Sequence, residues 1–320
     1  MDVTAIALFL QLSVQMGTPI LYGTLGGILG EKAGNLNLGV EGMMLLGAII
    51  GFLTAVNTAN PVVAVLAAGF AGMIGAVIYA FITVTLRGNQ IVTGLALTIF
   101  GGGVAGFLGK GLASVALPAS VNGAFSTITI PILVDIPIIG KALFEQNIFV
   151  MAAPVIAILM AIYFKKTNIG LNHRMVGENP AAADASGIAV NRYKYISLAV
   201  GGFLCGQGGA YLSLAFVPRW QDNITAGLGW IAVALVIFST WKPLRAIFGA
   251  YFFGILRALV FKIQGVKFSI FGLQFSVASN ILDMLPYVMT IIVLIIITFG
   301  HNRSSQPPEG LSVPYFREDR

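Results

Sequence analysis

Three polar side chains that could bind a ligand or take part in chemistry open an otherwise apolar segment near the N-terminus. Asn35, Asn37 and Glu41 precede a run rich in Met, Leu, Ala and Ile. An ionisable side chain inside an apolar helix is costly unless it contacts water or a polar partner. Glu41 is therefore a candidate for a gate, for a contact with a polar solute, or for a hydrogen bond between helices.

Amide and hydroxyl side chains occur in two further apolar segments. Asn89, Gln90 and Thr93 open one of them, and the four-residue spacing of Asn89 and Thr93 predicts that they share a helix face. Gln207 lies within a run of glycines, where close backbones would place its amide near the middle of a helix bundle. These side chains could hydrogen-bond sugar hydroxyls or a base edge, or they could serve ordinary polar packing.

The sequence lacks the usual residue patterns of catalysis. Its two histidines, His173 and His301, lie in polar segments, and no paired acids or nucleophile elbow accompany them. No Gly-x-x-x-x-Gly-Lys-Ser/Thr motif is present, so this chain cannot be an ATPase. Cys205 is the single cysteine, which excludes an intrachain disulfide and a cysteine-based metal motif. We expect no catalytic residue, metal site or cofactor in the chain.

The largest polar segment between apolar runs is 165–194. Within it, Asn179 is a good helix cap, Pro180 suits the first helical position, alanines follow, and Gly187 can end the turn. The pattern predicts a short helix whose small side chains leave a shallow surface. Such a surface can seat in a groove of another protein, although a structural connector could look the same.

The composition indicates that these residues are positioned by membrane helices. Hydrophobic residues make up 57% of the chain and charged residues 9%, with a mean hydropathy of +0.91, whereas soluble domains carry roughly 25% charged residues. The net charge of +6 comes from basic residues spread through short connectors, without interleaved aromatics. This spread is typical of a topology signal in a bilayer rather than of nucleic-acid binding.

Apolar runs predict an all-α, polytopic transmembrane bundle of about nine spans, between about eight and ten. They lie near 5–29, 37–57, 61–86, 91–109, 148–164, 195–216, 227–240, 244–262 and 282–299. The run 227–240 is short enough to be tilted, broken or re-entrant, and 111–147 could contain a further short helix. Residues 1–300 would form the membrane domain and 301–320 a cytoplasmic tail.

The distribution of Lys and Arg predicts the orientation. We place loop 165–194 in the cytoplasm and assign the connectors on either side of it to alternate faces of the membrane. This arrangement puts most of the 18 Lys and Arg residues in the cytoplasm, as the positive-inside rule expects. The N-terminus would then lie outside and the C-terminus inside.

Glycine spacing indicates close helix packing. The chain has 39 glycines, and several lie four residues apart, including Gly47 with Gly51, Gly102 with Gly106 and Gly202 with Gly206. Small residues at this spacing let helix backbones approach each other.

Two motifs carry a resemblance to a known family. Residues 178–188 resemble the Glu-Asn-Pro-x-Ala-Ala-x-x-x-Gly-Ile pattern in membrane subunits of ABC importers for simple sugars, nucleosides and branched-chain amino acids. Residues 30–44, Gly-Glu-Lys-Ala-Gly-Asn-Leu-Asn-Leu-Gly-Val-Glu-Gly-Met-Met, are similar to the first-to-second span signature of the same permeases. The tail at 311–319 also fits the shorter of the two paired permeases in nucleoside systems.

This resemblance implies an importer permease in the cell inner membrane that pairs with a second, longer permease. A cytoplasmic ABC ATPase would bind ATP and Mg, and a substrate-binding lipoprotein would deliver the solute from outside. The resemblance also implies the residues that the ATPase receives: Arg174, Gly177, Glu178, Asn179, Pro180, Ala182, Ala183, Gly187 and Ile188. The candidate path residues are Asn35, Asn37, Glu41, Asn89, Gln90, Thr93 and Gln207.

We expect this chain to carry nucleosides by alternating access driven by the separate ATPase. A simple sugar or another small polar solute is the alternative substrate. An autonomous secondary transporter would be expected to show intramembrane charge pairs or an internal repeat, and a membrane enzyme would be expected to show clustered acids or histidines. The sequence shows none of these features.

Overall fold

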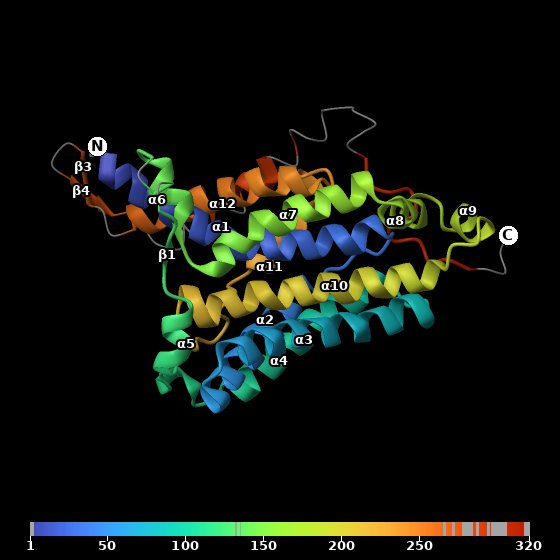
Figure 1. Cartoon of the computed structure of the whole chain (residues 1–320), viewed down its shortest axis with the longest axis horizontal. Helices are drawn as coiled ribbons and strands as arrows, with labels where there is room; N and C mark the ends of the chain where they lie inside the picture. The colour runs from blue at the N-terminus through green and yellow to red at the C-terminus, as the bar shows by residue number, and fades with distance from the viewer. Residues whose placement is uncertain are drawn as a thin grey trace.

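The computed structural model describes residues 3–131, 133–134, 136–264, 267–270, 273–276, 284–285, 288–292, 295 and 306–316. Its long helices run side by side along the longest axis of the molecule (Figure 1). They are α1 (Val3–Lys32), α2 (Val40–Thr58), α3 (Pro61–Ala80), α4 (Gln90–Gly109), α7 (Ile148–Lys166), α10 (Val190–Ala210) and α12 (Pro243–Ile263). The π-helical turns η1 (Phe81–Thr85) and η3 (Tyr211–Phe216) extend α3 and α10.

Local sequence sets the ends of these helices. At the start of α3, the Asn60 side chain accepts hydrogen bonds from the amides of Val62 and Val63, and Pro61 takes the first helical position. An apolar stretch follows, in which backbone hydrogen bonding is satisfied inside the helix.

Within the described residues, seven helices are long and apolar enough to cross a membrane. The prediction of an all-α, polytopic bundle is therefore confirmed. The segment expected to be a short or broken span forms α11 (Leu228–Phe238), which is much shorter than the others. The predicted span at 282–299 lies largely outside the described residues.

Two predicted boundaries need correction. The second span begins at Val40 rather than at residue 37, so Asn35 and Asn37 belong to the connection before it. The sixth begins at Val190 rather than at 195, so Arg192 and Lys194 are helical. Long basic side chains fit into the end of an apolar helix because their methylene groups pack there, which shortens the polar loop.

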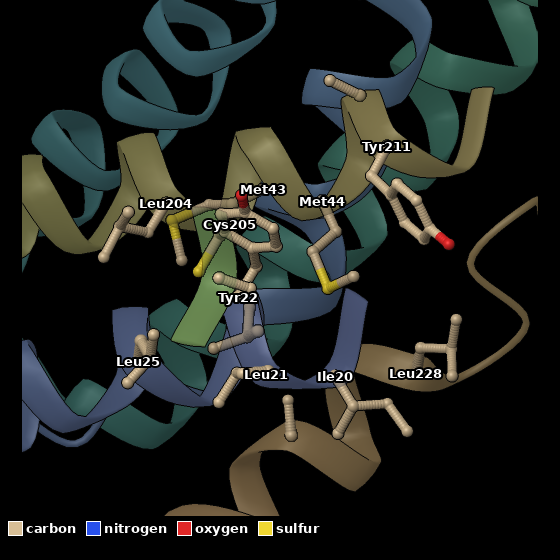
Figure 2. Close-up of a cluster of buried hydrophobic side chains, with 14 of the residues drawn as sticks. Ile20, Leu21, Tyr22, Leu25, Met43, Met44, Leu204, Cys205, Tyr211 and Leu228 are labelled. Carbon is tan, nitrogen blue, oxygen red and sulfur yellow. The ribbon is translucent and has the colours of Figure 1, made fainter. Parts of the chain in front are cut away.

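The core lies where α1, α2 and α10 meet. Leu21 and Leu25 of α1, Met43 of α2, and Leu204 and Cys205 of α10 are buried against one another (Figure 2). The outer helices keep apolar side chains exposed, as a multi-pass membrane protein requires: Ile99 is 77% exposed, Phe107 80% and Phe248 77%.

Glycine permits a close crossing of α2 and α10. A Cβ atom at Gly47 on α2 would collide with the backbone of Gly206 on α10, so neither helix could approach as closely with larger residues. The predicted role of glycine is confirmed here but not for the pair Gly102 and Gly106 on α4. A Cβ at Gly106 would meet no atom within 4 Å, and one at Gly102 would meet Leu45 Cδ1 at 3.9 Å.

Short elements cover both ends of the bundle. At one end lie α5 (Ala119–Ala124), α6 (Ile139–Phe144), a strand pair of β1 (Ile128–Thr129) with β2 (Glu145–Gln146), and a hairpin of β3 (Lys267–Ile270) with β4 (Leu273–Ser276). A 3-10 turn, η2 (Leu112–Ser114), precedes α5. At the opposite end lie α8 (Asn168–Glu178) and α9 (Pro180–Ala185) (Figure 1).

Candidate functional site

The short helix predicted after Asn179 is present as α9. The Asn179 side chain accepts a hydrogen bond of 2.9 Å from the amide of Ala182, and Pro180 occupies the first turn. The helix ends at Ala185, and Gly187 has a φ of +80°, where a residue with a side chain would be strained.

Alanines divide α9 into a buried and an exposed face. Ala183 is fully buried and packs in a small apolar cluster with Val176 and Val190. Ala182 and Ala185 are exposed. The exposed side is therefore shallow, and Glu178 and Asn179 lie exposed at its start.

Residues 306–316 form a C-terminal strap across this end of the bundle. Gly310 donates its amide to the carbonyl of Gly177 at 2.9 Å, and Ser312 donates its amide to the carbonyl of Gly34 at 3.2 Å. The phenol of Tyr315 donates to Asp184 Oδ2 at 2.7 Å. The strap thus connects α8 and α9 to the α1–α2 connection.

The strap also contacts the end of α3. The guanidinium carbon of Arg87 lies 4.5 Å from the centroid of the Phe316 ring, which is cation–π geometry. The strap therefore contacts α9, the α1–α2 connection and the residue that follows η1.

His173 fastens α8 to three long helices. Its Nε2 lies 3.0 Å from the carbonyl oxygen of Leu29 on α1, and its Nδ1 lies 3.2 Å from the hydroxyl of Tyr163 on α7. The hydroxyl of Ser197 on α10 lies 3.3 Å from Nε2. A carbonyl only accepts, so Nε2 donates and Nδ1 accepts in the neutral ring.

The environment keeps this ring neutral. Burial lowers the pKa of His173 from 6.5 to about 4, the nearby charge of Lys32 acts in the same direction, and the bond to Leu29 opposes them.

Glu41 links α2 to the segment before α11. Its carboxylate accepts hydrogen bonds from the amide of Gly227 at 2.9 Å, from the amide of Gly229 at 2.6 Å and from the hydroxyl of Thr225. The two amides belong to the N-terminus of α11, where a negative charge is favourable. Of the three roles considered for Glu41, this geometry directly supplies the hydrogen bond between helical segments.

A cavity of about 760 Å³ opens beside Glu41. Its wall includes Thr98 of α4, Asn223 of the loop before α11, Trp230 of α11 and Arg257 of α12. Trp230 is 37% exposed although its helix is mostly buried. An aromatic face and several hydrogen-bonding groups therefore surround one space of a size suited to a small ligand.

The other residues predicted for the path lie away from this cavity. Asn89 caps α4 through the amide of Val92, and the Thr93 hydroxyl donates to the carbonyl of Asn89. Gln90 accepts from the amide of Leu36 at 2.8 Å, and Gln207 donates to the carbonyl of Val65 at 2.9 Å.

Asn35 and Asn37 also have local surroundings. Asn37 accepts from the amide of Gly39 at 2.8 Å. The buried amide of Asn35 has no hydrogen-bond partner among the residues that the structure describes.

Sequence reasoning did not find Trp230, Asn223 or Arg257. They come from separate segments with no characteristic spacing, so only the packing of α11 against α2 and α12 brings them together. His173 was noted as a polar-loop residue, but its burial depends on α1, α7 and α10. No group of three or more His, Cys, Asp or Glu residues that could hold a metal occurs in the described part of the chain.

Several known proteins match most of the chain. The protein named "Putative glucose ABC transporter permease protein TsgC13" of Haloferax volcanii is 38% identical over 82% of this chain and 79% of its own length. Nucleoside ABC transporter permease protein NupC of Lactococcus lactis is 34% identical over 87% of this chain and 88% of its own. Guanosine ABC transporter permease protein NupQ of Bacillus subtilis is 30% identical, with 100% of both chains covered.

The family comparison agrees with the helical, membrane-spanning fold and with these relatives. A family model described as branched-chain amino acid transport system / permease component matches residues 10–294. The chain belongs to this family and is a permease subunit of an ABC importer. Such a permease subunit is not itself an enzyme.

Proposed function

We propose that this chain forms, with a second and longer permease, the path by which nucleosides cross the cell inner membrane. The observation that carries this proposal is the cavity beside Glu41, where the Trp230 indole and the polar groups of Thr98 and Asn223 line one space of about 760 Å³. A nucleoside has a flat base that stacks on an indole and a ribose that exchanges hydrogen bonds with amides and hydroxyls.

The substrate assignment favours nucleosides over sugars for two reasons. Two of the three relatives above carry names that specify nucleoside or guanosine transport, and one of them spans the whole chain. A simple sugar has no aromatic base, so stacking on Trp230 would contribute less to its binding. The relative named for glucose keeps a simple sugar as the second candidate.

The cavity is one half of the proposed path. It opens beside α4, whose Ile99 and Phe107 side chains are exposed. The second permease covers this side, so the solute is enclosed between the two subunits. Glu41 holds α11 in place and thereby positions Trp230 three residues after Gly227.

The α8 and α9 end faces the cytoplasm in this proposal, with the N-terminus outside and the C-terminal strap inside. Lys165 and Lys166 end α7 at this side, which agrees with the positive-inside rule. A cytoplasmic ATPase that binds ATP and Mg receives the exposed face of α9. The coupling residues are those of the sequence motif, 174–188, and a substrate-binding lipoprotein delivers the nucleoside outside.

The test measures uptake of radiolabelled nucleosides and simple sugars into proteoliposomes that contain this chain with its co-purifying permease and ATPase. The binding protein is supplied outside and ATP inside. We expect nucleoside uptake that requires ATP and that falls on the order of tenfold in Trp230→Ala, since stacking on a base is worth about 1–3 kcal/mol. Trp230→Phe should retain most of the uptake.

The matched control is Phe248→Ala, which removes an aromatic ring that is 77% exposed and lies outside the cavity. It should leave uptake unchanged. ATP-dependent uptake of a sugar but not of nucleosides would replace the nucleoside assignment by the sugar alternative. Uptake by this chain alone, without ATP, would support a secondary transporter instead.

A further inference from the structure

A second cleft, of about 520 Å³, lies at the α8 end of the bundle. It is bordered by the last turns of α1 and α7, by α8 and by the turn that leads from α11 into α12. Its basic lining residues are Lys32, Lys165, Arg174, Lys242 and Arg245. They come from four parts of the sequence, so the fold gathers them.

These positive charges are weakly compensated. In the part of the chain that the structure describes, no Asp or Glu forms a salt bridge with any of the five. Glu178 attracts the ammonium group of Lys32 only at longer range, and the positive charges of Arg174 and Lys242 both repel that group. Glu31 is nearby, but its carboxylate accepts the indole N–H of Trp241 at 2.6 Å and is fully buried.

Two of the basic groups are held in position. The Nζ of Lys32 lies 5.5 Å from the centroid of the Phe164 ring, and Arg245 donates from Nη1 to the hydroxyl of Thr240 at 2.7 Å. The Nε–H of Arg174 is buried and has no hydrogen-bond partner among the described residues. A buried guanidinium donor without a partner is costly, so an acceptor that enters the cleft gains a hydrogen bond that the described residues do not supply.

The rest of the lining is apolar. Ala161 and Phe164 of α7 and Leu244 of α12 form part of the wall, and Leu244 is 40% exposed. The cleft also lies where α1 and α7 end and α12 begins, and all three helices are long and apolar enough to cross a membrane. A ligand that fits must therefore carry a negative group at the interface and apolar chains that extend toward the bilayer.

We propose that this cleft binds an anionic phospholipid of the adjoining leaflet. Its phosphate accepts hydrogen bonds from Arg174 and is surrounded by Lys165, Lys242 and Arg245, while an acyl chain lies against Phe164 and Leu244. Guanidinium groups suit phosphate because they donate in a planar fork, and basic pockets between membrane helices are a known recognition mode for anionic headgroups. Free inorganic phosphate shares the headgroup chemistry but cannot use the apolar wall.

Such a lipid would contact the element that carries the coupling motif. Arg174 lies on α8 and leads directly to Glu178 and α9, whereas Lys242 ends the connection between α11 and α12 and Arg245 lies in the first turn of α12. The bound lipid joins these two regions and lowers their relative mobility. The cleft is separate from the cavity beside Glu41, although it shares Arg174 with the proposed coupling segment, and lipid binding there does not depend on the nature of the transported solute.

The experiment measures lipid binding directly on the full chain purified in detergent. Dioleoylphosphatidylglycerol, dioleoylphosphatidylcholine or inorganic phosphate is added, and the retained molecules are counted by native mass spectrometry. The wild type should retain phosphatidylglycerol in clear preference to phosphatidylcholine. Lys165→Gln/Lys242→Gln should weaken that retention on the order of tenfold, since each basic residue near an anionic headgroup is worth about 1 kcal/mol.

The matched control is Lys166→Gln/Arg192→Gln, which removes the same charge from the same end of the bundle but outside the cleft. It should retain phosphatidylglycerol like the wild type. Lys165→Gln alone changes an exposed side chain, so it tests the cleft even if the double variant does not fold.

Equal retention of the two lipids by the wild type would overturn the proposal, as would equal loss in the cleft and control variants. Displacement of phosphatidylglycerol by millimolar inorganic phosphate would assign the cleft to free phosphate instead of lipid.

Discussion

The Tyr315 hydroxyl donates a hydrogen bond of 2.7 Å to Asp184 Oδ2, although the two residues are 131 positions apart in the chain. Asp184 lies on α9, the short helix with the coupling motif, and Tyr315 lies near the end of the C-terminal strap. The same strap donates amides to Gly177 and Gly34. The position of α9 is therefore set partly by the end of the chain.

We expect Tyr315→Phe to loosen α9 without unfolding the bundle. The substitution removes one hydrogen bond to a carboxylate but keeps the ring, and such a bond is worth about 1.5–3 kcal/mol. Hydrogen–deuterium exchange of the α9 amides should accelerate on the order of tenfold or more, while α1 and α10 remain protected. Val313→Ala changes an exposed strap residue and is the control. Unchanged exchange in α9 would show that the strap does not hold it.

Glu41→Gln should destabilise the protein because it replaces a carboxylate that accepts from the N-terminus of α11. A glutamine presents only one oxygen, and its amide group would face the N–H groups of Gly227 or Gly229. The expected loss is about 2 kcal/mol or more, since hydrogen bonds to charged groups are each worth about 1.5–3 kcal/mol.

Thermal unfolding in detergent measures this loss, with Glu309→Gln as the control because its side chain is exposed. A melting temperature for Glu41→Gln equal to that of the control would mean that the carboxylate does not hold α11.

Local sequence was sufficient to predict the features that depend on interactions between neighbouring residues in the chain. Asn179, Pro180 and Gly187 specify the cap, the first turn and the end of α9 over a few residues, and apolar runs of span length specify the long helices. The same logic located Glu41 as a costly group in need of partners. It could not identify them, because Thr225 and Gly229 are more than 180 residues away.

Features that depend on packing between distant segments were not predictable from sequence. The role of Trp230 depends on how α11 lies against α2 and α12. Gly47 and Gly106 each belong to a glycine pair of the same spacing, yet only Gly47 faces another backbone. Spacing defines a face of a helix but does not determine which neighbour that face meets.

Gly47 and Gly106 provide a matched test of helix packing. Gly47→Ala places a methyl group against the backbone of Gly206, so α2 and α10 must separate. Overpacking of this kind costs about 1–3 kcal/mol. Gly106→Ala meets no atom within 4 Å and should leave the stability of the isolated chain unchanged or slightly higher. Thermal unfolding of both variants in detergent compares them, and equal melting temperatures would contradict the close crossing.

The buried His173 should make stability depend on pH between about 6.5 and 4. Its pKa is about 4 in the folded chain and 6.5 when it is exposed. As the pH falls, the His173 ring of the unfolded chain therefore binds its proton first, and the ring in the folded chain binds a proton only when the pH nears 4. The stabilisation is complete above pH 6.5 and is lost progressively below it, by about 1 kcal/mol at pH 5.5 and about 3 kcal/mol near pH 4.

Comparison with His173→Gln isolates this contribution from the titration of carboxylates, because both proteins share those groups. Glutamine can still hydrogen-bond Leu29 or Tyr163 but does not titrate. At pH 7.5 the wild type should be the more stable protein, and its advantage in unfolding free energy should shrink as the pH is lowered. An advantage that stays constant from pH 7.5 to pH 4.5 would mean that His173 takes up its proton equally in both states, which a ring buried against Leu29 and Ser197 cannot do.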